Sequence, residues 1–301
     1  MHQIRTDLAM ESVGGRNLQD LPGIDISTWE AGGISITAVS IETEVGAQLL
    51  EKPIGQYITL ECPQLPQKSV EVRESVSAIL GEELSRLLPE SQSTVLVIGL
   101  GNRMVTPDAI GPKTIDKVLV TRHLFEALPD AVDQRMGRVC AVAPGVLGLT
   151  GVETLEVVKG IVDHVKPEAV IAVDALAAQH TERIGTAIQL SSGGICPGSG
   201  VGNQRKAISN ETLGVPVIAL GVPTVIYAAS LVRDAVMGAD DGGDLAQDIE
   251  RDVLEGPLGE MIVTPREVDD MVGEIARVLA SGINRALHPG LSDREIQLMM
   301  E

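Results

Sequence analysis

The sequence predicts an α/β fold in three layers, with a mostly parallel sheet flanked by helices. Two runs are almost wholly apolar, residues 95–100 (VLVIGL) and residues 169–173 (AVIAV), as expected of parallel strands that helices cover on both faces. Stretches with helical periodicity alternate with such runs along most of the chain, which is typical of α/β proteins. The first 67 residues are instead rich in β-branched residues and turns, and they predict a β-rich N-terminal segment.

The first elements follow from these periodicities. Residues 34–39 alternate at the period of a half-buried strand, and residues 57–60 form a second candidate strand. From Gln67 to Leu88 apolar residues recur at helical spacing, which predicts an amphipathic helix leading into the strand at 95–100. The alternation then predicts, in order, a helix near 112–128, a strand at 139–143, a helix near 152–165 and the strand at 169–173.

The C-terminal part extends the predicted sheet. Strands are expected at 186–190 and 217–220, the second followed by a turn and the start of a helix, and a long helix near 265–286 closes the fold. The uncharged stretch 212–232 is long enough to span a bilayer, but its Gly and Pro residues favour a buried strand and a turn. Between Asp234 and Glu260 there are nine acidic residues and one Arg, so a solvated loop or excursion is expected.

Composition and charge exclude several classes of function. The 301 residues carry 23 Lys and Arg against 42 Asp and Glu, a formal charge of −19, and only four residues are aromatic. An acidic surface repels phosphate backbones and few side chains can stack on bases, so a peptide or neutral substrate fits better than nucleic acid. The N-terminus has no apolar core of signal-peptide length. Cys62, Cys140 and Cys196 form no CxxC pair, which is compatible with a reducing cytoplasm.

Two aspartates follow predicted strands of the sheet. Asp108 lies in the loop after residues 95–100, and Asp174 directly follows the strand at 169–173 with apolar residues on both sides. In open α/β sheets, ligands collect at the carboxyl ends of parallel strands, so both carboxylates are expected at one edge of the sheet. An isolated buried carboxylate is costly, and Asp174 therefore needs a partner or a proton.

Two roles fit this placement. Two carboxyl groups a hydrogen bond apart do not both ionise easily, so one keeps a proton while the other activates water as a general base, as in aspartic proteases. Alternatively, Asp108 caps the helix that starts near Pro112 or ends a turn, and Asp174 caps the next helix. Because Asp is common at strand-to-helix junctions, spacing alone favours this structural role. Spacing does not decide which carboxyl is the acid and which the base.

A glycine-rich loop is a weaker candidate for binding. Its residues are Gly198, Ser199, Gly200, Val201, Gly202 and Asn203, followed by Arg205 and Lys206, and they could form a nest of backbone amides for an anion or a peptide carbonyl. The loop lacks the P-loop ending and does not lie between a strand and a helix, so a plain flexible loop fits better. No GxSxG elbow occurs, so a serine hydrolase of that type is unsupported. The five His residues are scattered and none forms HExxH, so no metal site is expected, and no cofactor is predicted.

Several rare strings occur in one order through nearly the whole chain. They are IGLGN (98–102), VTPDAIGP (105–112), TRHLF (121–125), APGV (143–146), VDALAA (173–178), PGSGVGN (197–203), GVPVI (214–218), GVPTV (221–225) and MIVTP (261–265). In these strings the chain resembles the germination proteases of endospore-forming bacteria. Such a series is far more specific than any single motif above.

The resemblance implies a fold, an activity and a site. It implies a phosphorylase- or hydrolase-like three-layer fold and a homotetrameric endopeptidase without a cofactor, which degrades the small acid-soluble proteins that coat DNA in dormant spores. The expected location is the cytoplasm of the forespore and then the spore core. The family is regarded as atypical aspartic proteases, and its two proposed catalytic aspartates match Asp108 and Asp174. Asn102 and the loop at 198–203 are candidates for holding the substrate or polarising its carbonyl.

The resemblance also implies a precursor. Family members are made as inactive zymogens that remove a short N-terminal segment, and residues 6–11 (TDLAME) resemble the family's substrate site, with the cut between Asp7 and Leu8. Residues 1–7 are therefore the candidate propeptide, shorter than in better-known members. Residues 8–301 are expected to form a single α/β protease domain, with its β-rich part at 8–67 and the acidic excursion at 234–260.

Two alternatives remain open from the residues. A hydrogenase-maturation-type endopeptidase, which uses nickel for recognition, shares the GxGN string after the first core strand and the later Asp-Ala pair. A noncatalytic α/β module could instead bind an anion at residues 198–203. Nickel-dependent cleavage would distinguish the first, and stabilisation by phosphate without peptidase activity the second.

Overall fold

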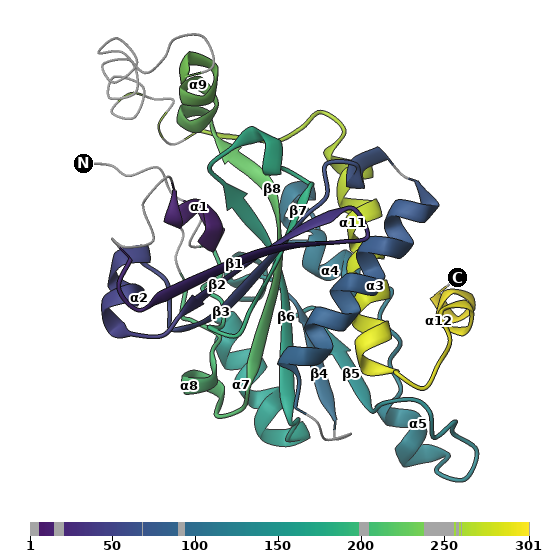
Figure 1. Ribbon diagram of the computed structural model, residues 1–301. Coiled ribbons are helices and arrows are strands. Elements are labelled where there is room, and N and C mark those ends of the chain that lie inside the picture. Colours follow the sequence, from purple (N-terminus) through teal and green to yellow (C-terminus); the bar gives the residue numbers. More distant parts are fainter. Residues whose placement is uncertain are drawn as a thin grey trace.

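The computed structural model describes residues 6–14, 21–67, 69–89, 94–198, 205–237, 256, 259 and 261–300 of the chain. One sheet organises these residues (Figure 1). Its strands are β1 (Ile24–Ala31), β2 (Ile34–Ile41), β3 (Gly55–Glu61), β4 (Val95–Gly99), β5 (Val139–Val142), β6 (Ala169–Ala178), β7 (Ala187–Ser191), β8 (Val217–Tyr227) and β9 (Ile262–Val263). Their order is β1-β2-β3-β7-β8-β6-β4-β5, and β9 pairs with β8.

Helices lie on both faces of this sheet. The longer ones are α3 (Val70–Leu87), α7 (Thr154–Val165), α9 (Ala228–Met237) and α11 (Val268–Leu287). Shorter ones are α1 (Ala9–Val13), α2 (Glu44–Leu50), α4 (Ile110–Ile115), α5 (Arg122–Ala127), α6 (Leu147–Thr150), α8 (Asn210–Leu213) and α12 (Asp293–Met300). The α/β class with a sheet between helices is thus confirmed.

The prediction of a mostly parallel sheet is wrong, because the sheet is mixed. Parallel pairings join β5, β4, β6 and β8, whereas β1, β2, β3, β7 and β9 all pair antiparallel to their neighbours. The reason lies in the connections. Parallel neighbours need a crossover of a dozen or more residues. The short links β1–β2 and β6–β7 instead reverse the chain, so β2 runs antiparallel to β1, and β7 runs antiparallel to β8, which is parallel to β6.

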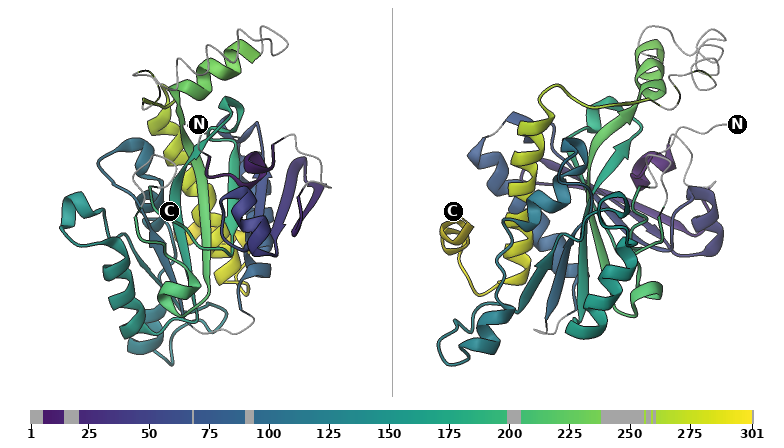
Figure 2. Two further views of the ribbon diagram at one scale, coloured as in Figure 1. Left: turned by 90° about the vertical axis from the view of Figure 1, so that its left-hand side faces the viewer. Right: turned by 180° about the vertical axis from the view of Figure 1, so that it is seen from behind.

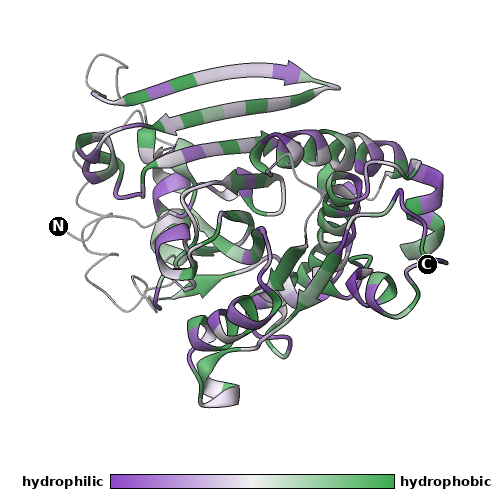
Figure 3. Cartoon of the chain, turned by 90° about the horizontal axis from the view of Figure 1, so that it is seen from below, coloured by the Kyte–Doolittle hydropathy of each residue, from purple (hydrophilic) through white to green (hydrophobic). Residues whose placement is uncertain are grey.

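The core divides between the two faces of the sheet. Helices α3 and α11 pack side by side on one face against residues such as Val97, Ile171 and Val173. Helix α7 covers the other face through Val158 and Val162, which contact the alternate strand residues. Figure 2 shows α11 and α7 on opposite sides of the sheet, and in Figure 3 the central strands are largely hydrophobic while the helices alternate in hydropathy.

The predicted helix near 112–128 is wrong as a single element, because the chain forms α4 and α5 with a bend between them. Asn284, a fully buried residue of α11, accepts a hydrogen bond from the backbone N–H of Leu119 at 2.9 Å and donates to the carbonyl of Lys117 at 3.1 Å. These bonds use backbone groups that a continuous helix would pair internally. The tertiary contact therefore ends α4.

The turn predicted after residues 217–220 is also wrong, because β8 continues to Tyr227. Gly221 and Pro223 remain in the strand, and the register with β6 shifts beside them, between Leu176 and Ala177. Such a shift accommodates a proline, which has no N–H to donate to the ladder. The uncharged stretch 212–232 thus supplies a buried strand, as predicted. None of the described helices is long and apolar enough to cross a membrane.

The acidic segment begins inside a helix. Asp234 belongs to α9, and its carboxylate contacts His180 Nδ1 at 3.1 Å and accepts the backbone N–H of Thr181 at 3.0 Å. A solvated loop is therefore wrong for residues 234–237. The remaining residues of the predicted excursion, except Gly256 and Gly259, lie outside the described residues.

Candidate active site

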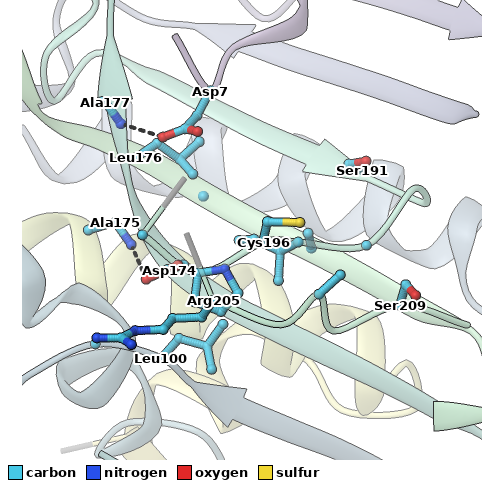
Figure 4. Close-up of a pocket in the computed structure, with 18 of the residues that line it drawn as sticks. Asp7, Leu100, Asp174, Ala175, Leu176, Ala177, Ser191, Cys196, Arg205 and Ser209 are labelled. Carbon is cyan, nitrogen blue, oxygen red and sulfur yellow. Dashed lines mark hydrogen bonds between the residues drawn. The ribbon is translucent and has the colours of Figure 1, made fainter. Parts of the chain in front are cut away.

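A cleft of about 1130 Å³ lies on the α7 side of the sheet. Asp108 and Asp174 both line it, as the sequence predicted, and so does Asp7 from the N-terminal segment. Figure 4 shows Asp7 and Asp174 beside the same stretch of β6, each hydrogen-bonded to a backbone amide of that strand. The fold thus brings both predicted carboxyl groups and the predicted processing site into one cavity.

A tight turn after β4 positions Asp108. The turn ends in the 3₁₀ helix η3 (Thr106–Asp108), and the backbone N–H of Asn102 donates to Asp108 Oδ2 at 2.7 Å. Gly101 has φ +103°, and a Cβ there would lie 2.0 Å from the Asp108 carbonyl oxygen, so the turn requires glycine. Thr224 of β8 donates to the carbonyl of Pro107 at 2.7 Å and fastens the turn to the sheet.

Asp174 lies within β6 rather than after its last residue. The strand continues to Ala178, and the predicted end at residue 173 marks only the last pairing with β4, Gly99 with Val173. Asp174 is 5% exposed, and its Oδ1 accepts the backbone N–H of Ala175 at 2.9 Å. Neither aspartate caps a helix, because Asp108 bonds Asn102 and Asp174 is part of a strand. The prediction that these aspartates cap helices is wrong, whereas the alternative that Asp108 ends a turn agrees with its bond to Asn102.

The two carboxyl groups differ in their electrostatic surroundings. Burial raises the pKa of Asp174 well above its usual value, and the nearby charges of Asp108 and Asp7 raise it further. Burial also raises the pKa of Asp108, but the Asn102 amide opposes that shift. Among their described contacts, each carboxyl accepts a backbone N–H, and no hydrogen bond joins the two directly. Asp174 is therefore the group that keeps its proton to higher pH.

This difference predicts that Asp174→Asn stabilises the protein near neutral pH. The unfolded chain releases this proton near the ordinary Asp pKa of about 3.9, and the folded state releases it at higher pH. The folded state thus binds more protons above about pH 4 and loses stability as the pH rises through that window. Asn carries no charge to bury, so the variant escapes this loss.

Thermal unfolding at two pH values measures the effect. The melting temperatures of variant and parent should be nearly equal near pH 4 and differ by a few °C near pH 7.5, with the variant higher. Asp116→Asn is the control, because Arg103 lowers the pKa of this exposed carboxyl and its loss brings no such gain. An equal difference at both pH values would contradict a raised Asp174 pKa.

The N-terminal segment occupies the cleft. The backbone of Asp7 donates to the Ala177 carbonyl at 3.0 Å, and the Ala177 N–H donates to Asp7 Oδ2 at 2.9 Å. Leu8 is fully buried and packs against Leu176 and Ala187. The predicted processing bond, Asp7–Leu8, therefore lies across β6 and β7, and Asp7 pairs with β6 three residues after Asp174.

Gln189 of β7 holds both sides of that bond. Its Oε1 accepts the N–H of Ala9 at 2.7 Å, so its Nε2 is turned to the carbonyl oxygen of Asp7, to which it donates at 3.0 Å. Gly221 pairs with both Gln189 and Asp174, which places their side chains on one face of the sheet. Gln189 was not among the predicted site residues, although a lone glutamine inside an apolar strand is a visible signal.

The residues predicted to hold the substrate, Asn102 and the loop at 198–203, are only partly placed by the structure. Asn102 lines the cleft, but its side chain accepts the Met104 N–H at 3.0 Å and it holds Asp108 through its backbone. Gly198 also lines the cleft, whereas Ser199, Gly200, Gly202 and Asn203 lie outside the described residues. The substrate-binding role of this loop stays a prediction.

Lys52, in the wall of the cleft, was also not predicted as a site residue. Lys52 Nζ donates to the carbonyl of Thr6 at 3.2 Å. Burial lowers the pKa of Lys52, and the charges of Asp7 and Glu11 counteract part of that shift. Lys52 follows a short helix without any motif, so local pattern does not mark it.

The fold and the cleft define an α/β protein that holds a peptide segment in a cleft lined by two buried carboxyl groups. Residues 2–239 and 237–299 match the family model described as germination protease. The germination protease of Clostridium tetani is 40% identical to the chain, and the match covers 97% of the chain and 98% of that protein. The germination protease of Clostridium perfringens is 42% identical, and the match covers 97% of each chain. That of Bacillus subtilis is 40% identical, with 96% of this chain and 94% of that protein covered. The protein is thus a peptidase, and the chain belongs to the germination protease family.

Proposed function

We propose that this protein is an endopeptidase of an atypical aspartic type, made as a precursor that cleaves its own Asp7–Leu8 bond. The processed form then cleaves small acid-soluble spore proteins during germination. The observation that supports this proposal most is the position of the Asp7–Leu8 bond, held by Gln189 in the cleft that Asp108 and Asp174 line. The family match runs through nearly the whole chain, whereas the likeness to hydrogenase-maturation endopeptidases is confined to two short strings.

The unequal carboxyl groups suggest which residue plays which role. Asp174, whose pKa burial raises most, is the general acid that enters the reaction protonated. Asp108 enters ionised, stabilised by the Asn102 amide, and is the general base. A water molecule between the two carboxyl groups is the nucleophile in this proposal, because no hydrogen bond joins the two carboxyl groups directly.

Hydrolysis then proceeds in two proton transfers. Asp108 takes a proton from the water as its oxygen attacks the carbonyl carbon of Asp7, and the Nε2–H of Gln189 stabilises the developing negative charge on the carbonyl oxygen. Asp174 gives its proton to the nitrogen of Leu8, and the C–N bond breaks. The products are a carboxyl group on Asp7 and an amine on Leu8, and the proton on Asp108 returns Asp174 to its starting state through solvent.

The same geometry accounts for an inactive precursor. Asp7, Leu8 and Ala9 lie over β6 and β7 and occupy both hydrogen-bonding groups of the Gln189 side chain, so an outside peptide has no access to Gln189 while they remain. Cleavage alone leaves Leu8 to Val13 attached to the body of the protein. Activation therefore also requires this segment to leave the cleft.

Mass spectrometry tests the proposal directly. The full chain, incubated over a range of pH, is expected to yield a form that begins at Leu8, and this form is expected to cut a small acid-soluble spore protein after acidic residues. A chelator should leave both reactions unchanged, whereas nickel-dependent cleavage would favour the alternative peptidase. A folded protein that cuts neither its own chain nor the spore protein would overturn the proposal.

The homotetramer, the cytoplasmic location and the single protease domain at 8–301 belong to the same proposal. These three features are proposed from the properties of the family. Sedimentation of the full chain and of the processed form would test the homotetramer.

A further inference from the structure

The peptide group that precedes the Asp7 side chain is held from two sides. The N–H of Asp7 donates to the Ala177 carbonyl of β6 at 3.0 Å, and the carbonyl of Thr6 accepts from Lys52 Nζ at 3.2 Å. The first partner is a backbone group of the sheet, whereas the second is a charged side chain from another part of the fold. The proposed chemistry uses Gln189 on the next peptide group and gives Lys52 no part.

The turn after α2 fixes the position of Lys52. Glu51 ends the helix in the left-handed conformation with φ +54°, so the N–H of Lys52 turns back and donates to the Ala47 carbonyl at 3.1 Å. On the other side, the hydroxyl of Tyr57, a buried residue of β3, donates to the Pro53 carbonyl at 2.8 Å. The main chain on both sides of Lys52 is thus tied down, and its side chain starts from a defined point in the cleft wall.

The half-buried ammonium of Lys52 lies in an acidic part of the cleft. Burial lowers its pKa, and the charges of Asp7, Glu11 and Glu51 counteract part of that shift. A buried ammonium is costly unless acceptors face it. Cleavage after Asp7 separates Thr6 and Asp7 from the rest of the chain, so the processed form loses the carbonyl that this ammonium binds. A peptide that takes the same place in the cleft supplies that carbonyl again.

The segment on the other side of the bond is anchored by different groups. Leu8 is fully buried, and Glu11 Oε2 accepts the N–H of Gln179 at 2.7 Å. Arg183 Nη1 lies 3.3 Å from the Oε1 atom of the same glutamate. These contacts hold residues that follow the bond, whereas Lys52 contacts a residue that precedes it. The contact of Lys52 therefore acts on a part of the peptide that these anchors do not hold.

We propose that Lys52 is a positioning residue that binds the main-chain carbonyl of the second residue before the scissile bond, in the uncut chain and in a protein substrate alike. This inference rests on the peptidase activity proposed above. Together with the Ala177 carbonyl, the ammonium fixes the peptide group next to the one that Gln189 polarises, so the reacting carbonyl is presented in one register. Since the contact is to the main chain, it applies to any side chain at that position.

Two peptides that differ in one atom test this contact. The first is a peptide of residues 1–16, and in the second the carbonyl oxygen of Thr6 is replaced by sulfur, which accepts hydrogen bonds only weakly. The unaltered processed form is expected to cleave the oxygen peptide with a kcat/KM about 10-fold higher, since a hydrogen bond from a charged donor contributes this much. Lys52→Met should lower this ratio to about 2 or less, and Lys52→Arg should keep part of it.

The two steady-state constants separate positioning from chemistry. Lys52→Met should raise KM for the oxygen peptide by about 10- to 100-fold and change kcat by about 3-fold or less. The contact forms when the peptide binds, and it lies one peptide group away from the carbon that water attacks. A lower kcat with an unchanged KM would contradict a positioning role. An equal rise in KM for both peptides would also contradict it, because the effect would then not depend on the Thr6 carbonyl.

Lys159→Met is the matched control. Lys159 is an exposed lysine of α7 that does not line the cleft, so its loss removes the same charge and should leave the ratio and KM within about 2-fold. Equal cleavage of both peptides by the unaltered protein would overturn the inference and leave the peptidase intact. That comparison needs no variant, so it decides even if Lys52→Met fails to fold. Cleavage of neither peptide, together with no self-cleavage, would overturn the proposed function itself.

Discussion

Asp108→Asn and Asp174→Asn are each expected to fold and to remain uncut, with self-cleavage at Asp7–Leu8 slowed by about 10³-fold or more. Asn keeps the oxygen that accepts the Asn102 or the Ala175 amide, so either variant preserves the local hydrogen bond. It removes the ability to accept a proton from water or to give one to the leaving amine. The loss is therefore chemical rather than structural.

Time courses of intact mass measure this effect, with thermal unfolding as the check on folding. Asp116→Asn is the control, because Asp116 pairs with Arg103 at an exposed position and should leave the rate within about 2-fold. Full activity in either active-site variant would remove that aspartate from the mechanism. The unaltered protein should also lose activity at high pH as Asp174 ionises, since burial raises its pKa and the acid must start protonated.

Gln189→Glu is expected to lower kcat by about 10²- to 10³-fold while changing KM by only a few-fold. The glutamate still accepts the Ala9 N–H, which holds the peptide in place, but it has no N–H for the Asp7 carbonyl oxygen. It also adds a negative charge where negative charge develops in the reaction. Gln189→Met removes both bonds and should lower kcat and raise KM together.

Steady-state cleavage of the residue 1–16 peptide by processed forms gives the two constants separately. The split between kcat and KM distinguishes carbonyl polarisation from simple binding. If Gln189→Glu raises KM and leaves kcat intact, Gln189 only holds the backbone, and the charge on the carbonyl oxygen must be stabilised elsewhere in the cleft.

Local sequence pattern was sufficient for many of the elements. Apolar runs located β4 and β6, and helical periodicity located α3, α7 and α11 to within a few residues. It was insufficient where a distant residue changed the outcome. Asn284 ended α4 from another part of the chain, and a register shift kept Pro223 in β8.

For the candidate site, too, the sequence identified residues but not their relative positions. The two aspartates and the Asp7–Leu8 bond were identified from the residues around them, because apolar runs beside a charge and a series of rare strings are visible in one dimension. Their joint position was not visible. Gln189 and Asp174 share one face of the sheet only because Gly221 pairs with both, and Arg183 contacts Glu11 only because the chain folds its N-terminus back across β6.

Periodicity records which face of an element is buried, and so the sequence alone was enough for the kind of fold and for the residues worth testing. Strand order and register depend on the relative stability of whole-chain packings, and no local pattern encodes them. The folded chain was therefore needed to show that half the sheet runs antiparallel, that Asp174 is the more deeply buried carboxyl, and that Lys52 reaches the carbonyl of Thr6.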